Sequence, residues 1–225
     1  MMNFAPHPQP TIYRTWPDVV GRLQDLDLAP DILSEVVKFA FAHFAECTPH
    51  DPKSGPGFNL WSKGVRGLRD RLVILNWKSG SASNYETVIH KSGLWQVTVA
   101  GADAHTGLDG PSPTTRTDKG RATERAIDLN QQSQAQGTLI AGMFPTFTTP
   151  VRQTWILLIH VDQMNAEVRS ELSRPVGFDE NRHVSWWDER ILLPSIPYHE
   201  AMLGSSQNDD EDGGDLNIDV PRRVG

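Results

Sequence analysis

Apolar and polar residues alternate with a helical period in the first part of the chain. Between Pro17 and Leu28, and again from Pro30 to Phe44, apolar residues recur every three or four positions, which is typical of amphipathic helices. Proline suits the first turn of a helix because its missing N–H would have no intrahelical partner there. The pattern therefore predicts a helical hairpin that turns between Leu28 and Pro30.

A third helix is predicted after a loop. Residues 48–59 contain three prolines and two glycines, a composition that favours a loop. From Leu60 to Leu72 the apolar residues return to helical spacing, although Gly64 and Gly67 weaken the pattern. We expect this helix to pack beside the hairpin.

The pattern then changes to that of strands. Residues 73–77 are apolar and partly β-branched, whereas residues 78–84 are mostly small and polar. The runs 85–91 and 94–100 flank a short turn that contains Gly93. The sequence predicts a strand at 73–77, a loop after it, and then an antiparallel hairpin.

The second half of the chain predicts more helix and more strand. A polar helix is expected at 120–134, and a central strand at 152–161, where the run is apolar on both faces. Residues 165–172 predict a short helix, and 184–193 predict one or two final strands. We therefore expect one α+β domain, with an N-terminal helical hairpin and a third helix packed on a mainly antiparallel sheet.

Composition and charge predict where this domain begins and ends and in which compartment the protein is found. The net charge is −7, and the segment from Asp209 onward holds six acidic and two basic residues, a net charge of −4. We expect an extended arm at 1–16, the domain at 17–203, and a disordered, solubilising acidic tail at 204–225. The single Cys47 excludes an intrachain disulfide, and no secretory signal or membrane-length apolar run is present. These features predict a cytoplasmic protein with no membrane partner.

Two segments are basic although the protein as a whole is acidic. Residues 62–78 carry a net charge of +4 and residues 112–126 a net charge of +2. The second segment also brings hydroxyl groups to the start of a predicted helix, where N–H groups favour an anion. An ordinary solvated helix face and loop are the alternative interpretations.

The leading hypothesis is a non-catalytic binding module for a phosphate-bearing partner, either nucleic acid or a nucleotide. It requires both basic segments to form one positive surface, with Trp61 and Trp77 near enough to stack on bases. The sequence assigns no cofactor. The residues predicted to bind phosphate are Arg66, Arg69, Arg71, Arg116, Lys119 and Arg121.

Two other functions stay open. A metal-assisted hydrolase would use Asp103 with His105 and His160 with Asp162, because carboxylate and imidazole groups two residues apart on a strand project to the same side. A protein-interaction subunit, in its simplest form a homodimer, would use exposed aromatic side chains. The aromatic candidates are Trp186, Trp187 and the stretch from Met143 to Phe147.

Overall fold

The computed structural model describes residues 9–140 and 151–203. The helices in these ranges are α1 (Trp16–Asp25), α2 (Pro30–Ala45), α3 (Gly55–Leu72), α4 (Arg121–Ile140) and α5 (Tyr198–Leu203), with a short 3-10 helix η1 (Val73–Leu75) after α3. The strands are β1 (Thr11–Tyr13), β2 (Lys78–Ala82), β3 (Tyr85–Ile89), β4 (Trp95–Gly101), β5 (Gln153–Asp162), β6 (Glu167–Phe178), β7 (Val184–Leu192) and β8 (Ile196–Pro197).

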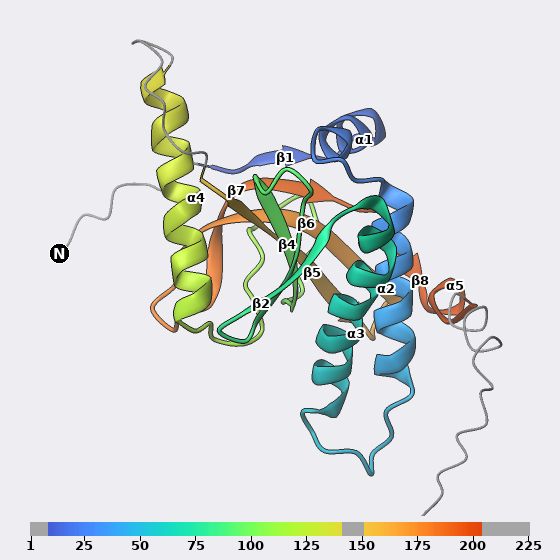
Figure 1. The fold of residues 1–225 in the computed structure, drawn as a ribbon. Coiled ribbons are helices and arrows are strands. Elements are labelled where there is room, and N and C mark those ends of the chain that lie inside the picture. The colour runs from blue at the N-terminus through green and yellow to red at the C-terminus, as the bar shows by residue number, and fades with distance from the viewer. Residues whose placement is uncertain (1–8, 141–150, 204–225) are drawn as a thin grey trace, which may run out of the picture.

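These strands form one mixed sheet in the order β1-β7-β6-β5-β4-β3-β2, and β8 pairs with β6 beside this path (Figure 1). The pairs β4–β5 and β1–β7 are parallel, and the other pairs are antiparallel. The strand predicted at 152–161 is confirmed as β5, which lies in the middle of the sheet. Residues 11–13 of the predicted arm form β1.

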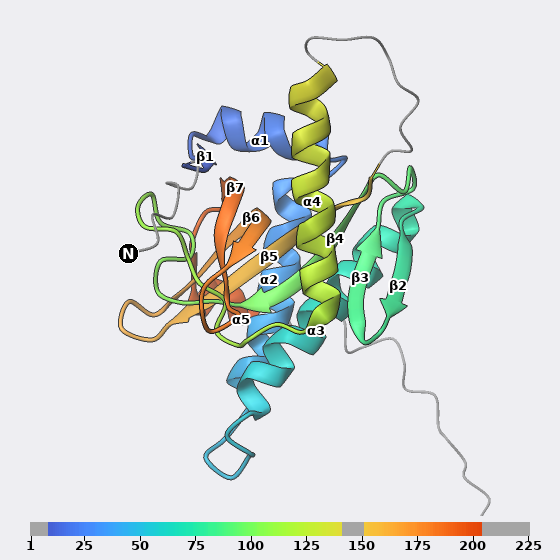
Figure 2. The ribbon, with the colours of Figure 1, turned by 90° about the vertical axis from the view of Figure 1, so that its left-hand side faces the viewer.

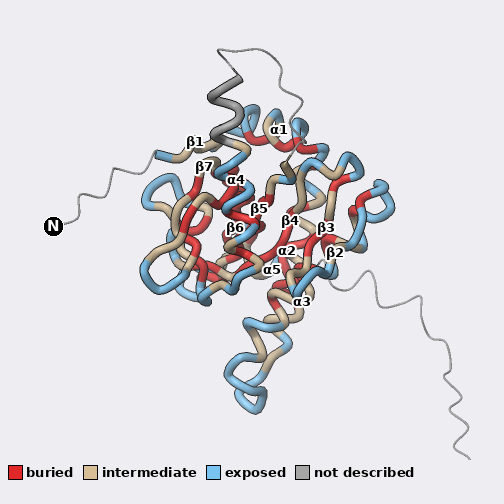
Figure 3. The backbone as a smooth tube through the Cα atoms, turned by 60° about the vertical axis from the view of Figure 1, so that its left-hand side comes forward, coloured by how far each residue is buried: buried red, intermediate tan, exposed pale blue. Residues whose placement is uncertain are grey.

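Helices cover both faces of this sheet (Figures 1 and 2). Alternate residues of β5 show the two layers: Trp155, Leu157 and Ile159 pack in the larger core against α1, α2 and α3. Ile156 and Leu158 belong to a smaller core under α4 on the opposite face. Buried positions therefore concentrate in the central strands (Figure 3), and the described residues form the single α+β domain that the sequence predicts.

The prediction of a strand at 73–77 is wrong. Residues 73–75 instead continue α3 as η1, and Asn76 takes a left-handed conformation (φ 67°) that ends the turn. The strand β2 begins at Lys78, in the polar segment for which a loop is predicted. It lies at the edge of the sheet with most of its residues exposed, so it needs no apolar side chains.

The short helix predicted at 165–172 is also wrong, because these residues lie mostly in β6. Most residues of β6 are buried although several of them are polar or charged. The strand therefore lacks the run of apolar residues by which a buried strand is usually recognised in a sequence. Glu171 forms a fully buried ion pair with Arg190 of β7, at 2.7 Å between Oε2 and Nη2. The remaining acceptor sites of Glu171 receive hydrogen bonds from the Gly107 N–H and the Ser173 hydroxyl. The buried carboxylate of β6 therefore has a hydrogen-bond or ion-pair partner on each of its oxygens.

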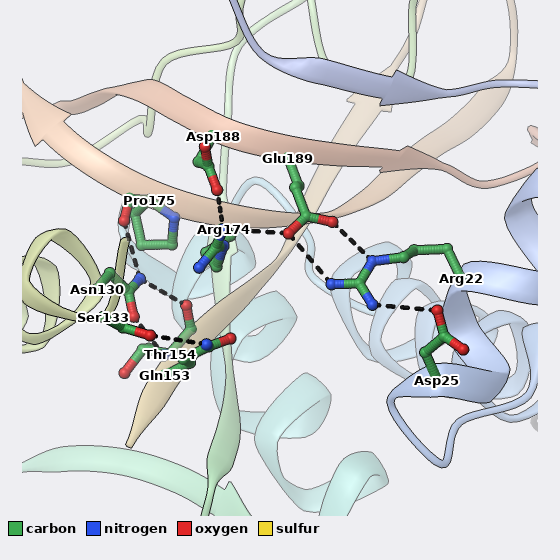
Figure 4. Close-up of polar contacts among 10 residues, drawn as sticks. All are labelled: Arg22, Asp25, Asn130, Ser133, Gln153, Thr154, Arg174, Pro175, Asp188 and Glu189. Carbon is green, nitrogen blue, oxygen red and sulfur yellow. Dashed lines mark hydrogen bonds and ion pairs between the residues drawn. The ribbon is translucent and has the colours of Figure 1, made fainter. Parts of the chain in front are cut away.

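Pro175 lies inside β6, where it has no N–H to donate to β5, and the side chain of Asn130 from α4 fills the resulting gap (Figure 4). Asn130 Nδ2 donates to the carbonyls of Thr154 (2.9 Å) and Pro175 (2.8 Å), and Asn130 Oδ1 accepts from the Thr154 N–H (2.8 Å). These contacts fasten α4 to the sheet and fix the direction in which its first turn projects.

A second group of charges in Figure 4 fastens α1 to the opposite face of the sheet. Arg22 makes two contacts with Glu189 of β7, at 2.6 and 3.1 Å, and Glu189 also pairs with Arg174. Asp25 and Asp188 complete the set. All five residues have partners in the fold, so this group is part of the packing.

Candidate phosphate-binding hollow

A split between β3 and β4 opens a concave region at the side of the sheet. β3 pairs with β4 only at Val88↔Val97 and Ile89↔Gln96, although it pairs with β2 along its whole length. The end of β4 near Ala100 therefore has β5 on one side and an opening on the other, across which the Thr98 hydroxyl donates to the Glu86 carbonyl (2.7 Å). α3 and the start of α4 flank this opening.

A cavity of about 460 Å³ occupies this opening, and a second cavity of about 520 Å³ adjoins it between the first turns of α3 and residues 116–119. They share Trp61, Ala100 and Lys119. Each volume lies in the range typical of small-ligand sites. We call the two cavities together the basic hollow; the residues that characterise it are Lys53, Phe58, Trp61, Arg116, Lys119, Arg121 and Arg125.

The wall that carries Trp61 is held close to the sheet. A Cβ atom on Gly64 would lie 2.8 Å from Val99 Cγ1, so the small residue lets α3 pack closely on β4. Trp61 precedes Gly64 by one helical turn and therefore lies on the same side of α3. The glycine that weakens the helical pattern in the sequence is thus required by the packing.

The opposite wall is the segment that leads into α4. The backbone N–H of Arg116 donates to the Gly101 carbonyl (2.9 Å), and the backbone N–H of Lys119 donates to the Arg182 carbonyl (2.9 Å). Thr115 is buried and bonds to Val184 through both its N–H and its hydroxyl oxygen. These bonds attach the segment to the ends of β4 and β7, and α4 begins directly after it.

In the described part of the chain, the cations of the hollow have no carboxylate partner. Among the described residues, no acidic group lies within 4.0 Å of the charged atoms of Arg116, Lys119, Arg121 or Arg125. The ammonium group of Lys119 donates to the Thr117 hydroxyl at 2.9 Å. Burial lowers the pKa of Lys119, while the charge of Asp118 acts in the opposite direction. An anion in the hollow would be attracted to the cations nearest to it.

Glu86 is the only acidic residue that lines the hollow in the described part of the chain. Its carboxylate accepts hydrogen bonds from the Ser81 hydroxyl and from Arg69 Nη2, and both hold the pKa of Glu86 below its usual value. The negative charge of Glu86 is therefore compensated by Arg69, which leaves the hollow with an excess of positive charge.

Two aromatic rings border the cations. Trp61 lines both cavities, and Phe58 lines the second one with 59% of its surface exposed. Their ring centroids lie 5.7 Å apart with the planes tilted by 56°. Exposed aromatic faces beside unpaired arginines are a combination found in nucleic-acid-binding grooves.

The structure divides the six residues predicted to bind phosphate into two groups. Arg116, Lys119 and Arg121 all line the basic hollow. The three arginines of α3 have other contacts: Arg69 pairs with Glu86 (2.5 Å), Arg66 pairs with Asp70 (3.3 Å), and both Arg66 and Arg71 lie over the ring of Phe39. α3 contributes an aromatic wall to the hollow instead of a row of cations.

The sequence names Trp61 and Trp77 as stacking rings, but Trp77 is buried and does not line the hollow. Phe58 and Lys53 are not identified from the sequence as members of the site. Both residues precede the predicted start of the third helix and fall in the segment assigned to a loop. The first turns of α3 instead begin at Gly55 and bring Phe58 beside Trp61. The spacing of Phe58 and Trp61 could have identified Phe58, because aromatic residues three positions apart share one face of a helix.

Three of the four side chains considered for metal-assisted hydrolysis, those of Asp103, His160 and Asp162, have local partners. The Asp103 carboxylate accepts from the His105 N–H, and His160 Nδ1 contacts the Ala102 carbonyl. Asp162 closes the β5–β6 turn by accepting from Asn165, and it pairs with Arg169. Within residues 9–140 and 151–203, no group of three or more His, Cys, Asp or Glu side chains is arranged to hold a metal ion.

The two tryptophans considered as a protein-contact surface are largely covered by the fold. Trp187 is buried and donates from Nε1 to the Pro113 carbonyl (2.7 Å), whereas Trp186 is partly covered and packs on Gly177. The stretch from Met143 to Phe147 lies outside the described residues.

None of the helices searched in the described ranges is long and apolar enough to cross a membrane. No protein-family model matches the chain, and comparisons with curated proteins and with solved structures find no match either.

Proposed function

We propose that the protein is a non-catalytic binding module that takes a phosphate-bearing ligand, nucleic acid or a nucleotide, into the basic hollow. The observation that carries this proposal is a set of five cations, Lys53, Arg116, Lys119, Arg121 and Arg125, that line a concave surface and have no carboxylate within 4.0 Å among the described residues. The start of α4 adds the positive end of a helix dipole to the same place.

Binding through these groups is expected to be sensitive to salt. Neutralising phosphates releases counterions, and each contact adds to the slope of log affinity against log salt. If about three phosphate contacts form on a single strand, the slope is about −2, and affinity falls roughly 20-fold between about 50 and 200 mM salt.

Neutralising two cations of the hollow is expected to weaken binding about ten-fold, close to 1.4 kcal/mol. The variant is Arg116→Gln/Arg121→Gln, since both residues are exposed and neither side chain makes a hydrogen bond to another described residue. The measurement is fluorescence polarisation with a labelled adenine nucleotide and a labelled short oligonucleotide at low salt.

The matched control is Arg66→Gln/Arg71→Gln, which removes the same charge from α3 outside the hollow. We expect this control to bind within about two-fold of the unchanged protein, since long-range effects of exposed charges are screened. Equal losses in the two variants, or no binding of either probe by the unchanged protein, would contradict the proposal.

A further inference from the structure

We infer that the ligand of the basic hollow is a single-stranded nucleic acid that runs across both cavities, with phosphates along the cations and a base on Phe58. This inference rests on the proposed function and goes further by naming the class of ligand. Three features of the hollow support it: the distribution of its cations, the exposure of its aromatic rings, and the place of both in the fold.

The cations are distributed along the hollow instead of converging on one point. Arg121 and Arg125 line the first cavity, Arg116 and Lys53 line the second, and Lys119 lies where the two meet. A site for a single nucleotide needs its positive charges around one phosphate group. A series of cations that extends through two adjoining cavities instead matches a chain of phosphates.

The aromatic rings offer a stacking surface at one end of this series. Phe58 is among the most exposed large apolar residues of the described structure, and its ring rests against Trp61. Its place beside the cations of the second cavity, more than its exposure alone, makes the ring available to a ligand held there. A base can stack on it whatever its sequence, because every base has a π-face.

The fold favours a single strand over a duplex. Proteins read the major groove of a duplex by inserting a helix or a two-stranded ribbon into it. Here the unpaired cations lie in a concavity between α3 and α4, while the arginines of α3 are engaged with Asp70, Glu86 and Phe39. A flexible strand can enter such a hollow and present unpaired bases to Phe58.

The first test is a length series measured by fluorescence polarisation. The probes are thymidine monophosphate, labelled oligothymidylates of two to twelve nucleotides, matching oligouridylates, and a duplex of twelve base pairs. We expect affinity to rise with length until the strand spans both cavities, and then to level off. The mononucleotide and the duplex are each expected to bind at least ten-fold more weakly than the twelve-nucleotide strand.

The second test removes the proposed stacking surface. Phe58→Ala should weaken binding of the twelve-nucleotide strand about 5- to 150-fold, the range for loss of one stacked base. The control is Trp16→Ala, which removes another exposed aromatic ring (54%) away from the hollow and should leave binding unchanged. Phe58→Tyr should retain affinity because it keeps the ring.

The outcomes separate this inference from the proposed function. If thymidine monophosphate binds as tightly as the oligomers, or the duplex binds as tightly as the single strand, the inference is overturned and the phosphate-binding module stands. An unchanged affinity in Phe58→Ala also overturns the inference. If no probe binds at low salt, both fail. Tighter binding of the thymidylate or the uridylate series supports the inference and shows which of the two strands, which differ in the sugar and in the thymine methyl group, the hollow prefers.

Discussion

Replacing Arg190 with methionine is expected to lower the free energy of unfolding by about 3–5 kcal/mol, because the change leaves the carboxylate of Glu171 buried without its counter-ion. Both side chains are fully buried, and the guanidinium contacts both carboxylate oxygens, at 2.9 and 2.7 Å. The Arg190 side chain also donates to the carbonyls of Leu108, Gly110 and Pro111. Equilibrium unfolding in urea, followed by far-UV circular dichroism, measures the change.

The double variant Arg190→Met/Glu171→Leu separates the charge from the packing. Removing both charges leaves no buried ion without a partner, and such replacements are often neutral or stabilising. We expect the double variant to recover at least half of the stability that Arg190→Met loses. An equal loss in both variants would show that the hydrogen bonds to the 108–111 carbonyls, and not the charge pair, account for the effect.

The same pair connects the core to the basic hollow. Gly107 donates to Glu171, and Arg190 holds the carbonyls of the following residues, so the loop after β4 is fixed on the buried sheet. This loop leads directly into the segment that carries Arg116 and Lys119. The hollow therefore depends on an ion pair that lies outside it.

Local patterns in the sequence predict much of this fold. The helical hairpin and the β3–β4 hairpin form between neighbouring parts of the chain, and the apolar run of β5 has few alternatives to a central strand. The sequence does not reveal β6 in the same way, because its buried charges find partners on β7. Local composition suggests a helix there, and only the sheet makes the strand favourable.

The same distinction applies to the candidate site. The basic segment at 112–126 is visible in the sequence, and part of it does line the hollow. The contacts of Arg69 with Glu86 and of Arg66 with Phe39 join distant segments and could not be predicted from local patterns, unlike the i,i+4 pair of Arg66 with Asp70. Which charges stay available for a ligand is decided by tertiary contacts between distant segments.

Replacing Asn130 with alanine is expected to destabilise the protein by about 3 kcal/mol, because it leaves buried backbone groups of Thr154 and Pro175 without partners. Ser133→Ala is the matched control on α4. The hydroxyl of Ser133 accepts from Gln153 at 2.9 Å in a less buried place, so its loss should cost about 1 kcal/mol. Urea unfolding of the three proteins at one pH measures both changes.

Asn130→Asp adds a pH dependence that a general packing defect would not produce. An ionised carboxylate at this buried position would face the carbonyl oxygens of Thr154 and Pro175, so the folded state raises the pKa of the introduced acid above its unfolded value. The protonated form is favoured in the folded state, and the deficit relative to the unchanged protein should therefore be largest at pH 7 and shrink as the pH falls through that raised pKa. Comparing the two proteins at each pH cancels the acid sensitivity they share through carboxylates with lowered pKa, such as Asp27 and Glu86. A deficit that is the same at pH 7 and pH 5 would contradict the role assigned to the Asn130 amide in bridging β5 and β6.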